Sequence, residues 1–230
     1  MGKKATIYFD LAHKLNKENK DKLKINQMHF RGSLNSISLI SISDEKPEIG
    51  KKINLKETYS IKEKENLVNK NIELINLKTI PHRPTPEKKL QSWIIKYALH
   101  NDYKLPFDNN LLFITSEIAI QNKNKKKIIN DILAYDVVKK QICIIELKST
   151  RSEKELIKQV TNFEEIINEN LQFFSELLFI HGFTNQKNNQ FSISKMIIWP
   201  YEKTSPKKKL KELGIIEVTY TNNYTFQYFK

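Results

Sequence analysis

The chain has 230 residues, of which 39% are hydrophobic, and it carries 39 Lys and Arg against 26 Asp and Glu, a formal net charge of +13. A chain of this length can bury a sizeable core, as one large domain or two small ones. No apolar stretch approaches the roughly 20 residues that span a bilayer, and the start, MGKKATIYFDLAHKL, lacks the features of a secretory signal, so we predict a cytoplasmic protein with no membrane partner.

The excess of positive charge favours polyanionic partners such as nucleic acid. A composition rich in lysine, asparagine and isoleucine is also typical of proteins from AT-rich genomes. The positive charge therefore indicates a function only where the sequence also shows a candidate functional site. Cys143 is the only cysteine and stands in an apolar run, which excludes an internal disulfide and predicts a packed thiol.

Residues 1–80 contain three short alternating stretches separated by charged segments. These stretches are ATIYFDL, SLNSISLISI and NIELINL. Because such alternation is typical of strands, we predict a small β-rich N-terminal domain with a role in substrate binding or interaction. The segment KTIPHRPTP, residues 78–86, holds three prolines, which favour extended backbone. We therefore place the domain boundary there and a second domain over residues 85–230.

The second domain begins with a predicted helix, which has Thr85 as its N-cap and Pro86 as its first residue and continues through EKKLQSWIIKYALH. Three strands follow as a meander: NLLFITSEIAI, IINDILAYDV and QICIIELKS. RSEKELIKQVTNFEEIINEN has apolar residues at helical spacing, LQFFSELLFIHGF reads as a second apolar helix or a helix and a strand, and the remaining segment alternates again. The fold class is α/β, with a mixed β-sheet core flanked by helices.

The strand ICIIELKST, residues 142–150, raises a physical problem. Glu146 and Lys148 point to the same side of this strand as Ile142 and Ile144, and both of its faces read as covered. A charge withdrawn from water costs several kcal/mol unless it is paired or bound to a metal. The alternative is a solvated strand end, where the chain simply leaves the core.

The preceding strand, IINDILAYDV, favours a functional role for the charged residues of ICIIELKST over a solvated strand end. If the turn between the two strands is centred in VVKK, antiparallel pairing places Asp131 directly opposite Glu146. Asp136 then lies near Gln141 and reads as a turn residue. A slip of one residue would send Asp131 to the other face of the sheet.

Two adjacent carboxylates repel each other unless one holds a proton or a cation neutralises both. A hard divalent ion such as Mg²⁺, with Mn²⁺ able to substitute, suits this all-oxygen arrangement. Lys148 could then orient a water molecule or stabilise charge that develops on phosphorus. The pattern predicts a metal held against a phosphodiester.

The pattern of Asp131 on one strand of a hairpin, Glu146-Leu147-Lys148 on the next and a following helix resembles the PD-(D/E)xK nuclease superfamily, and most of all its RecB-like and NucS-like branch. Four stretches carry the resemblance, which covers residues 85–182: NDILAYD, CIIELKS, the glutamine in KQVTNF and the acidic helix EKKLQSWI. Asn130 stands where the family motif has proline. The superfamily motif is short and its members diverge widely, so the resemblance concerns the fold more than one protein.

The resemblance implies a restriction-endonuclease-like fold and a set of roles at the hairpin. Asp131 and Glu146 would be metal ligands, with the backbone carbonyl of Leu147 as a third, and Lys148 would be the catalytic lysine. Glu117, on the strand before, could supply a further carboxylate to the metal, or it could be a surface residue at a strand edge.

Two further catalytic candidates lie on the flanking helices. Glu87 falls within an apolar helical stripe, where a glutamate seldom lacks a partner, although an acidic residue in a first turn also complements the helix dipole. Gln159 borders the stripe of its helix and could hydrogen-bond the catalytic lysine or the substrate, or it could be a partly exposed spacer.

The predicted function is metal-dependent hydrolysis of phosphodiester bonds, with DNA favoured over RNA, in repair, restriction or phage defence. The alternative is an inactive module of the same fold that binds nucleic acid or a protein. The basic runs QNKNKKK and SPKKKLK read as solvated segments or as phosphate contacts, and His82 and Arg83 could approach the substrate. An enzyme that cuts both strands often works as a dimer, so a homodimer is left open.

Overall fold

The computed structural model describes residues 6–43, 50–53, 60–76, 84–121, 126–150, 153–187, 190–201, 208–221 and 223–229. The chain divides into two compact units, Gly2–Lys96 and Tyr97–Lys230, the latter with Met1. The predicted boundary segment lies partly outside the described residues, as do His82 and Arg83. No helix within the described ranges is both long and apolar enough to cross a membrane.

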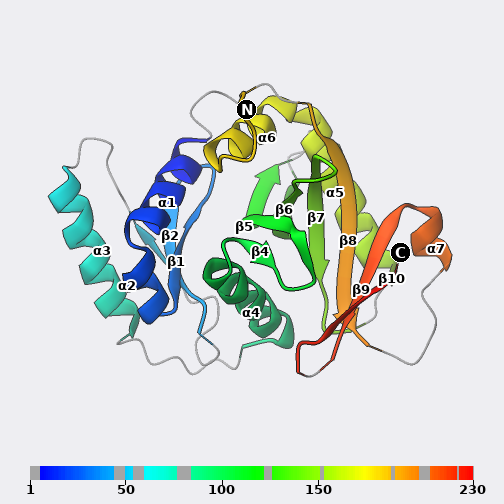
Figure 1. The fold of residues 1–230 in the computed structure, drawn as a ribbon, viewed down its shortest axis with the longest axis horizontal. Helices are drawn as coiled ribbons and strands as arrows, with labels where there is room; N and C mark the ends of the chain where they lie inside the picture. The colour runs from blue at the N-terminus through cyan, green and yellow to red at the C-terminus, as the bar shows by residue number, and fades with distance from the viewer. Residues whose placement is uncertain are drawn as a thin grey trace. The chain divides into compact units, whose positions relative to one another are not determined.

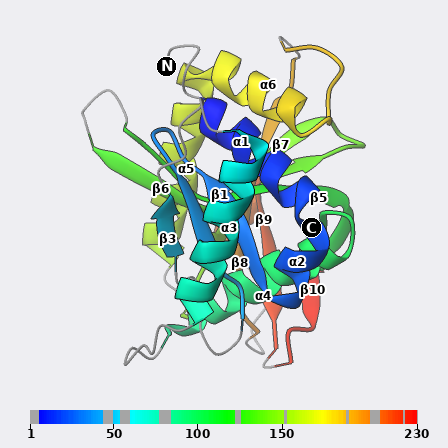
Figure 2. The ribbon, with the colours of Figure 1, turned by 90° about the vertical axis from the view of Figure 1, so that its left-hand side faces the viewer.

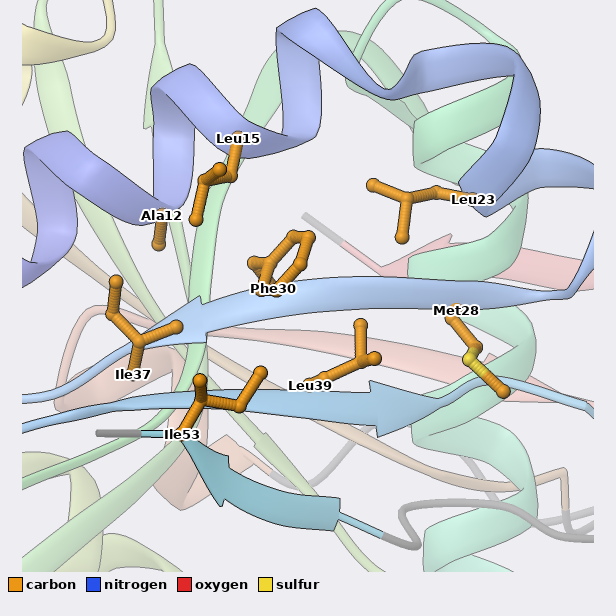
Figure 3. Close-up of a cluster of buried hydrophobic side chains, with 8 residues drawn as sticks. All are labelled: Ala12, Leu15, Leu23, Met28, Phe30, Ile37, Leu39 and Ile53. Atoms are coloured by element: carbon orange, nitrogen blue, oxygen red, sulfur yellow. The ribbon is translucent and has the colours of Figure 1, made fainter. Parts of the chain in front are cut away.

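The first unit contains a three-stranded antiparallel sheet in the order β1-β2-β3 together with helices (Figures 1 and 2). Its elements are α1 (Ile7–Glu18), α2 (Lys20–Ile25), β1 (Met28–Gly32), β2 (Ile37–Ser41), β3 (Gly50–Ile53) and α3 (Ile61–Asn76). Side chains from α1, α2 and all three strands form a buried apolar cluster (Figure 3). The members are Ala12, Leu15, Leu23, Met28, Phe30, Ile37, Leu39 and Ile53.

Gly32 allows α1 to approach the end of β1 closely. A Cβ atom at Gly32 would lie 2.7 Å from the Cα of Phe9 and 2.8 Å from the carbonyl oxygen of Tyr8. Any side chain there would push the helix away from the sheet, so glycine is a packing requirement at this position.

The prediction of a β-rich N-terminal domain is wrong, because two of its three proposed strands are helical. ATIYFDL lies mostly within α1, and NIELINL falls largely within α3. In α1, Tyr8, Leu11, Ala12 and Leu15 recur at helical spacing and pack on the sheet, so a 3.6-residue period and not a two-residue period describes the segment. The third stretch, SLNSISLISI, does contain β2 as predicted.

The helix α4 (Pro86–His100) begins where the sequence predicts. The backbone N–H of Lys88 donates to Oγ1 of Thr85 across 3.3 Å, so Thr85 caps the helix, and Pro86 is its first residue. Leu90, Ile94 and Ala98 of the predicted stripe are fully buried.

The second unit is built on a curled, mixed, seven-stranded sheet in the order β10-β9-β8-β7-β6-β5-β4 (Figure 1). Its strands are β4 (Lys104–Leu105), β5 (Asp108–Gln121), β6 (Lys127–Asp136), β7 (Gln141–Leu147), β8 (Ser192–Pro200), β9 (Ile215–Tyr220) and β10 (Phe226–Phe229). Its helices are α5 (Glu153–Glu169), α6 (Leu171–Ile180) and α7 (Lys208–Glu212). The rings of Phe107, before β5, and Phe226, on the opposite edge strand β10, lie 5.3 Å apart, which reflects the curl of the sheet. The α/β class and the mixed sheet flanked by helices are therefore confirmed.

The predicted meander and its register are confirmed. β5, β6 and β7 pair in antiparallel order, whereas β7, β8 and β9 run parallel. Asp136 pairs with Gln141, and Ile132 pairs with Ile145 at the other end of the β6–β7 ladder. Asp136 accepts hydrogen bonds from the backbone N–H groups of Val138 and Lys139, so it is a turn residue as expected.

The helix α5 covers the face of the sheet that carries Ile144. Lys195 of β8 pairs with Ile144 of β7 and shares its side of the sheet. The Nζ of Lys195 lies 2.7 Å from Oε2 of Glu164 on α5, which places the helix over this face. A buried stripe along α5 fills the interface. Its members are Leu156, Val160, Phe163, Ile166 and Ile167.

Candidate active site

The backbone ladder between β6 and β7 stops one residue before the two predicted carboxylates. Ile132 and Ile145 are the last regular pair, so Asp131 and Glu146 come next on the two strands. From there, side chains of β6 replace backbone groups as partners of β7. Oδ2 of Asp131 accepts from the backbone N–H of Leu147 across 2.8 Å, and Nδ2 of Asn130 donates to the carbonyl oxygen of Ile145 across 3.0 Å. The strands therefore remain joined, while one oxygen of Asp131 is used by the protein backbone.

Glu146 is a carboxyl group with very little access to water, since only 1% of the residue is exposed. Burial raises the pKa of Glu146 well above its ordinary value, and the charge of Asp131 and a hydrogen bond between the two carboxyl groups raise it further. A bond from Nδ2 of Asn130 to Oε1, at 3.2 Å, and the charge of Lys148 act in the opposite direction. The two carboxyl groups are thus in contact, as the sequence predicts, and their contact favours the protonated form of Glu146.

Lys148 follows β7 directly and lies at the edge of the sheet where the parallel strands end. Its backbone N–H donates to the carbonyl oxygen of Ile198 across 2.9 Å, which ties the residue to β8. The side chain is half-buried, and its positive charge acts on Glu146. The interpretation of Glu146 as part of a solvated strand end is therefore wrong, because this glutamate is buried and bonded.

The carbonyl group of Leu147 is also directed toward the opened ladder. In an antiparallel pair the N–H and C=O of one residue face the same neighbouring strand. Since the N–H of Leu147 faces Asp131, its carbonyl oxygen faces the β6 side as well. Two carboxylates and one backbone carbonyl therefore converge at the end of β6 and β7, all of them oxygen donors.

Glu117 lies on the next strand, β5, level with Asp131. Its neighbours Ser116 and Ile118 pair with Ile132 and Asn130, respectively, so Glu117 occupies the position across from Asp131. Glu117 has a positive φ of 48°, which is uncommon for a residue with a side chain. Within the described ranges, no group of three or more His, Cys, Asp or Glu side chains could hold a metal, so Glu117 does not complete such a group with the pair.

Gln159 of α5 borders the same region by the geometry of the helix. Glu164 contacts Lys195, so it lies on the side of the buried α5 stripe that faces β8. At about 3.6 residues per turn, Gln159 lies on the other side of this stripe, toward β6. The two positions are about 7.5 Å apart along the helix, close to the roughly 6.6 Å between Ile144 and Glu146 on β7. From these ideal dimensions we expect Gln159 to lie level with the carboxylate pair. Its Oε1 is buried and has no hydrogen-bond partner among the described residues.

Glu87 belongs to the other compact unit, where it is half-buried in the first turn of α4. Its proposed catalytic role stays a prediction. The described lysines of the two basic runs, Lys126, Lys127, Lys209 and Lys211, are exposed, which suits both a solvated segment and a phosphate contact.

One further prediction concerns a buried side chain. Burial raises the pKa of the Cys143 thiol to about 12, as expected of a packed thiol. Trp199 is also fully buried, and its Nε1 donates to Oε1 of Glu217 across 2.7 Å.

Sequence reasoning treated Asn130 only as a departure from a motif, yet the structure makes it a central residue of the site. It is fully buried, its amide nitrogen contacts both Ile145 and Glu146, and its Oδ1 has no partner among the described residues. The sequence feature that could have identified Asn130 is its polar side chain within the otherwise apolar strand IINDILA. Such a residue needs hydrogen-bond partners from the neighbouring strand.

Comparison with known proteins adds no assignment. No protein-family model matches the chain, and no curated protein matches it.

Proposed function

We propose that the protein is a metal-dependent nuclease with a PD-(D/E)xK-like, restriction-endonuclease-like domain that hydrolyses phosphodiester bonds, in DNA rather than RNA. The observation that carries this proposal is the contact between the buried carboxyl group of Glu146 and the half-buried carboxyl group of Asp131, beside Lys148. A structural role explains this arrangement poorly, because two carboxyl groups in contact destabilise each other once both are ionised.

The residues at the end of β6 and β7 fit a hard divalent cation such as Mg²⁺ or Mn²⁺. Asp131, Glu146 and the carbonyl of Leu147 offer only oxygen donors, and such ions bind carboxylates and carbonyls while keeping several waters. Such an ion, when bound, would supply Lewis-acid stabilisation of charge on the phosphodiester. The cation would also neutralise the pair that is costly without it.

The chain's own groups have distinct roles in the proposed hydrolysis. Water attacks phosphorus, so one P–O bond forms and the bond to the leaving oxygen breaks, and that oxygen takes up a proton. The ammonium group of Lys148, at the strand end, stabilises the negative charge that develops on the phosphoryl oxygens. Asn130 positions Glu146 by its hydrogen bond, and the carboxamide of Gln159 is available to orient Lys148 or the substrate.

The test is cleavage of labelled single-stranded, duplex and branched DNA, and of RNA, with Mg²⁺, Mn²⁺ or EDTA. The proposal predicts cleavage by the wild type that requires the metal and is lost in Glu146→Gln. Asp136→Asn is the matched control, because Asp136 is another buried carboxylate of β6 but serves the turn. Binding of nucleic acid that is undiminished in EDTA, with no cleavage of any substrate, would support the inactive binding module instead.

A further inference from the structure

Trp199 and Glu217 form a polar pair in the interior of the parallel part of the large sheet. Trp199 is fully buried in β8, and Glu217 is 3% exposed in β9. Nε1 of the indole donates to Oε1 of the carboxyl group across 2.7 Å. The bond joins side chains of two neighbouring strands and fixes the direction of the indole ring, which extends from β8 toward β9.

The Trp199–Glu217 pair lies on the face of the sheet that carries the candidate active site. Glu146 pairs with Ile197 across β7 and β8, and Ile197 pairs with Glu217 across β8 and β9. Because paired residues of parallel strands point to the same side of a sheet, the two glutamates share one face and one row. Trp199 follows Ile197 by two residues, so its side chain lies on this face as well.

Lys148 and Trp199 are neighbours in the next row of the same face. Leu147 pairs with Ile198 at the end of the β7–β8 ladder. The N–H of Lys148 donates to the carbonyl oxygen of Ile198 across 2.9 Å, which continues the ladder by one step and brings Lys148 level with Trp199. Neighbouring strands lie about 4.8 Å apart. By this register the stem of the Lys148 side chain begins beside the indole.

The burial of Glu217 has a cost that calls for a compensating role. β9 is a central strand between β8 and β10, where an apolar side chain would pack without the cost of removing a carboxyl group from water. A buried polar pair that is hydrogen-bonded adds little stability over apolar residues, but it can select one orientation of the groups that it joins. The group that Glu217 orients is the indole next to Lys148.

We propose that Trp199, held by Glu217, is a positioning residue for Lys148: the indole is the surface against which the lysine side chain packs, so that the ammonium group is held near Glu146. This inference rests on the proposed nuclease function, in which Lys148 acts on the phosphate. The half-buried Lys148 can cover the indole with its apolar stem while its charged end reaches the edge of the sheet. Without that surface the flexible stem would sample many positions, and a misplacement of about 1 Å can lower a rate about 10²-fold.

The first measurement is the fluorescence of Trp199. The sequence has two tryptophans, so Trp93→Phe leaves Trp199 as the only one. Lys148→Met in this background should change the emission maximum and the lifetime, because a charge next to the ring acts on its π-system. Lys139→Met, at the exposed turn of the same hairpin, is the control and should leave the emission unchanged. Unchanged emission in Lys148→Met would overturn the inference.

The second measurement separates positioning from stability. Glu217→Leu removes the acceptor of the indole N–H, so the ring is no longer fixed. The kcat for DNA cleavage should then fall by about 10–100-fold, at unchanged KM and unchanged affinity for Mn²⁺. Glu217→Gln keeps an oxygen that accepts from the indole and should restore most of the rate. Failure of Glu217→Gln to restore it, or an unchanged kcat in Glu217→Leu, would overturn the role of the hydrogen bond.

Val218→Ala is the matched control for a loss of stability. Val218 is fully buried on the same strand, β9, but it points to the opposite face of the sheet from Glu217. The variant should lower the Tm, because a buried side chain is truncated, and keep the kcat of the wild type. A loss of kcat equal to that of Glu217→Leu would show that the effect is one of stability alone, and would overturn the inference.

The two proposals fail separately. If the wild type cuts DNA but the emission of Trp199 does not respond to Lys148→Met, the positioning role is wrong and the nuclease proposal stands. If the wild type never cuts, the nuclease proposal fails. A response of Trp199 to Lys148→Met that Glu217→Leu abolishes would then show that the indole positions Lys148 in a protein that is not a nuclease.

Discussion

The backbone N–H of Leu147 donates a hydrogen bond to Oδ2 of Asp131 across 2.8 Å. A side chain of β6 thereby takes the place of a backbone acceptor at the point where the β6–β7 ladder opens. The bond holds the Asp131 carboxyl group beside Glu146. This junction explains how a buried strand can end in a glutamate and a lysine.

Glu146→Gln should stabilise the metal-free protein. The pKa of Glu146 is raised above its ordinary value of 4.5, so its contribution to stability is present below that pH and is lost as the pH rises toward the raised pKa. A glutamine can donate to Asp131 and accept from Asn130 without a charge. Each pKa unit of the shift corresponds to about 1.4 kcal/mol, which is equivalent to a Tm increase of roughly 3–6 °C. Thermal unfolding of both proteins at neutral pH in EDTA measures the difference, and a lower Tm for the variant would contradict the account.

Metal binding should strengthen as the pH rises. A divalent ion must displace the proton held by Glu146, so affinity for Mn²⁺ should increase by up to about tenfold per pH unit below the raised pKa of Glu146. Isothermal titration at several pH values between about 5 and 8, in buffers of different ionisation enthalpy, would also detect the released proton. An affinity that is independent of pH would show that Glu146 is already ionised.

Lys148→Met should remove activity and keep the fold. The variant retains the apolar stem of the side chain but loses the charge, so cleavage should fall by about 10²–10³-fold, as for other groups that stabilise developing charge. Mn²⁺ binding should persist, because the proposed ligands are unchanged. Lys139→Met, at the exposed turn of the same hairpin, is the control and should cut normally. Retained turnover in Lys148→Met would remove this lysine from the mechanism.

Gln159→Leu should separate function from stability. The Oε1 of Gln159 is buried without a partner among the described residues, so an apolar side chain of similar size should leave the Tm unchanged or raise it. Cleavage should nevertheless fall, by about tenfold if one hydrogen bond to Lys148 or the substrate is lost. Gln172→Leu on α6, an exposed position, controls for the substitution. A variant that unfolds at a lower temperature and cuts normally would assign Gln159 a structural role.

The sequence was sufficient to predict the hairpin that carries the site. A short turn between two apolar strands favours the register in which Asp136 lies near Gln141, although a slip of one residue was possible, and the structure has the favoured register. The start of α4 was equally readable, because Thr85 and Pro86 are residues whose side chains define a helix N-terminus.

The N-terminal helices were misread for a physical reason. A short stretch such as ATIYFDL satisfies a two-residue and a helical period alike, and only Leu15 and the packing on the sheet distinguish them. For α3 the signal existed: Ser60 and Glu63 form a capping box, in which the backbone N–H of Ser60 donates to Oε2 of Glu63 across 2.7 Å. That Ser-x-x-Glu spacing predicts a helix where strand-like alternation was weighed instead.

Long-range contacts in the site had no local signal. The role of Asn130 depends on Ile145 and Glu146, which lie across the hairpin from it. Sequence periodicity assigns a residue to a face of one strand but does not choose the neighbouring strand.

Direct measurement of Mn²⁺ binding by electron paramagnetic resonance, on the wild type, Glu146→Gln and Asp136→Asn, tests the central claim that Asp131 and Glu146 hold a divalent cation. The account predicts that the wild type and Asp136→Asn bind Mn²⁺, that Mg²⁺ displaces it, and that Glu146→Gln does not bind it. Absence of binding by the folded wild type at neutral pH, or equal binding by Glu146→Gln, would contradict the account.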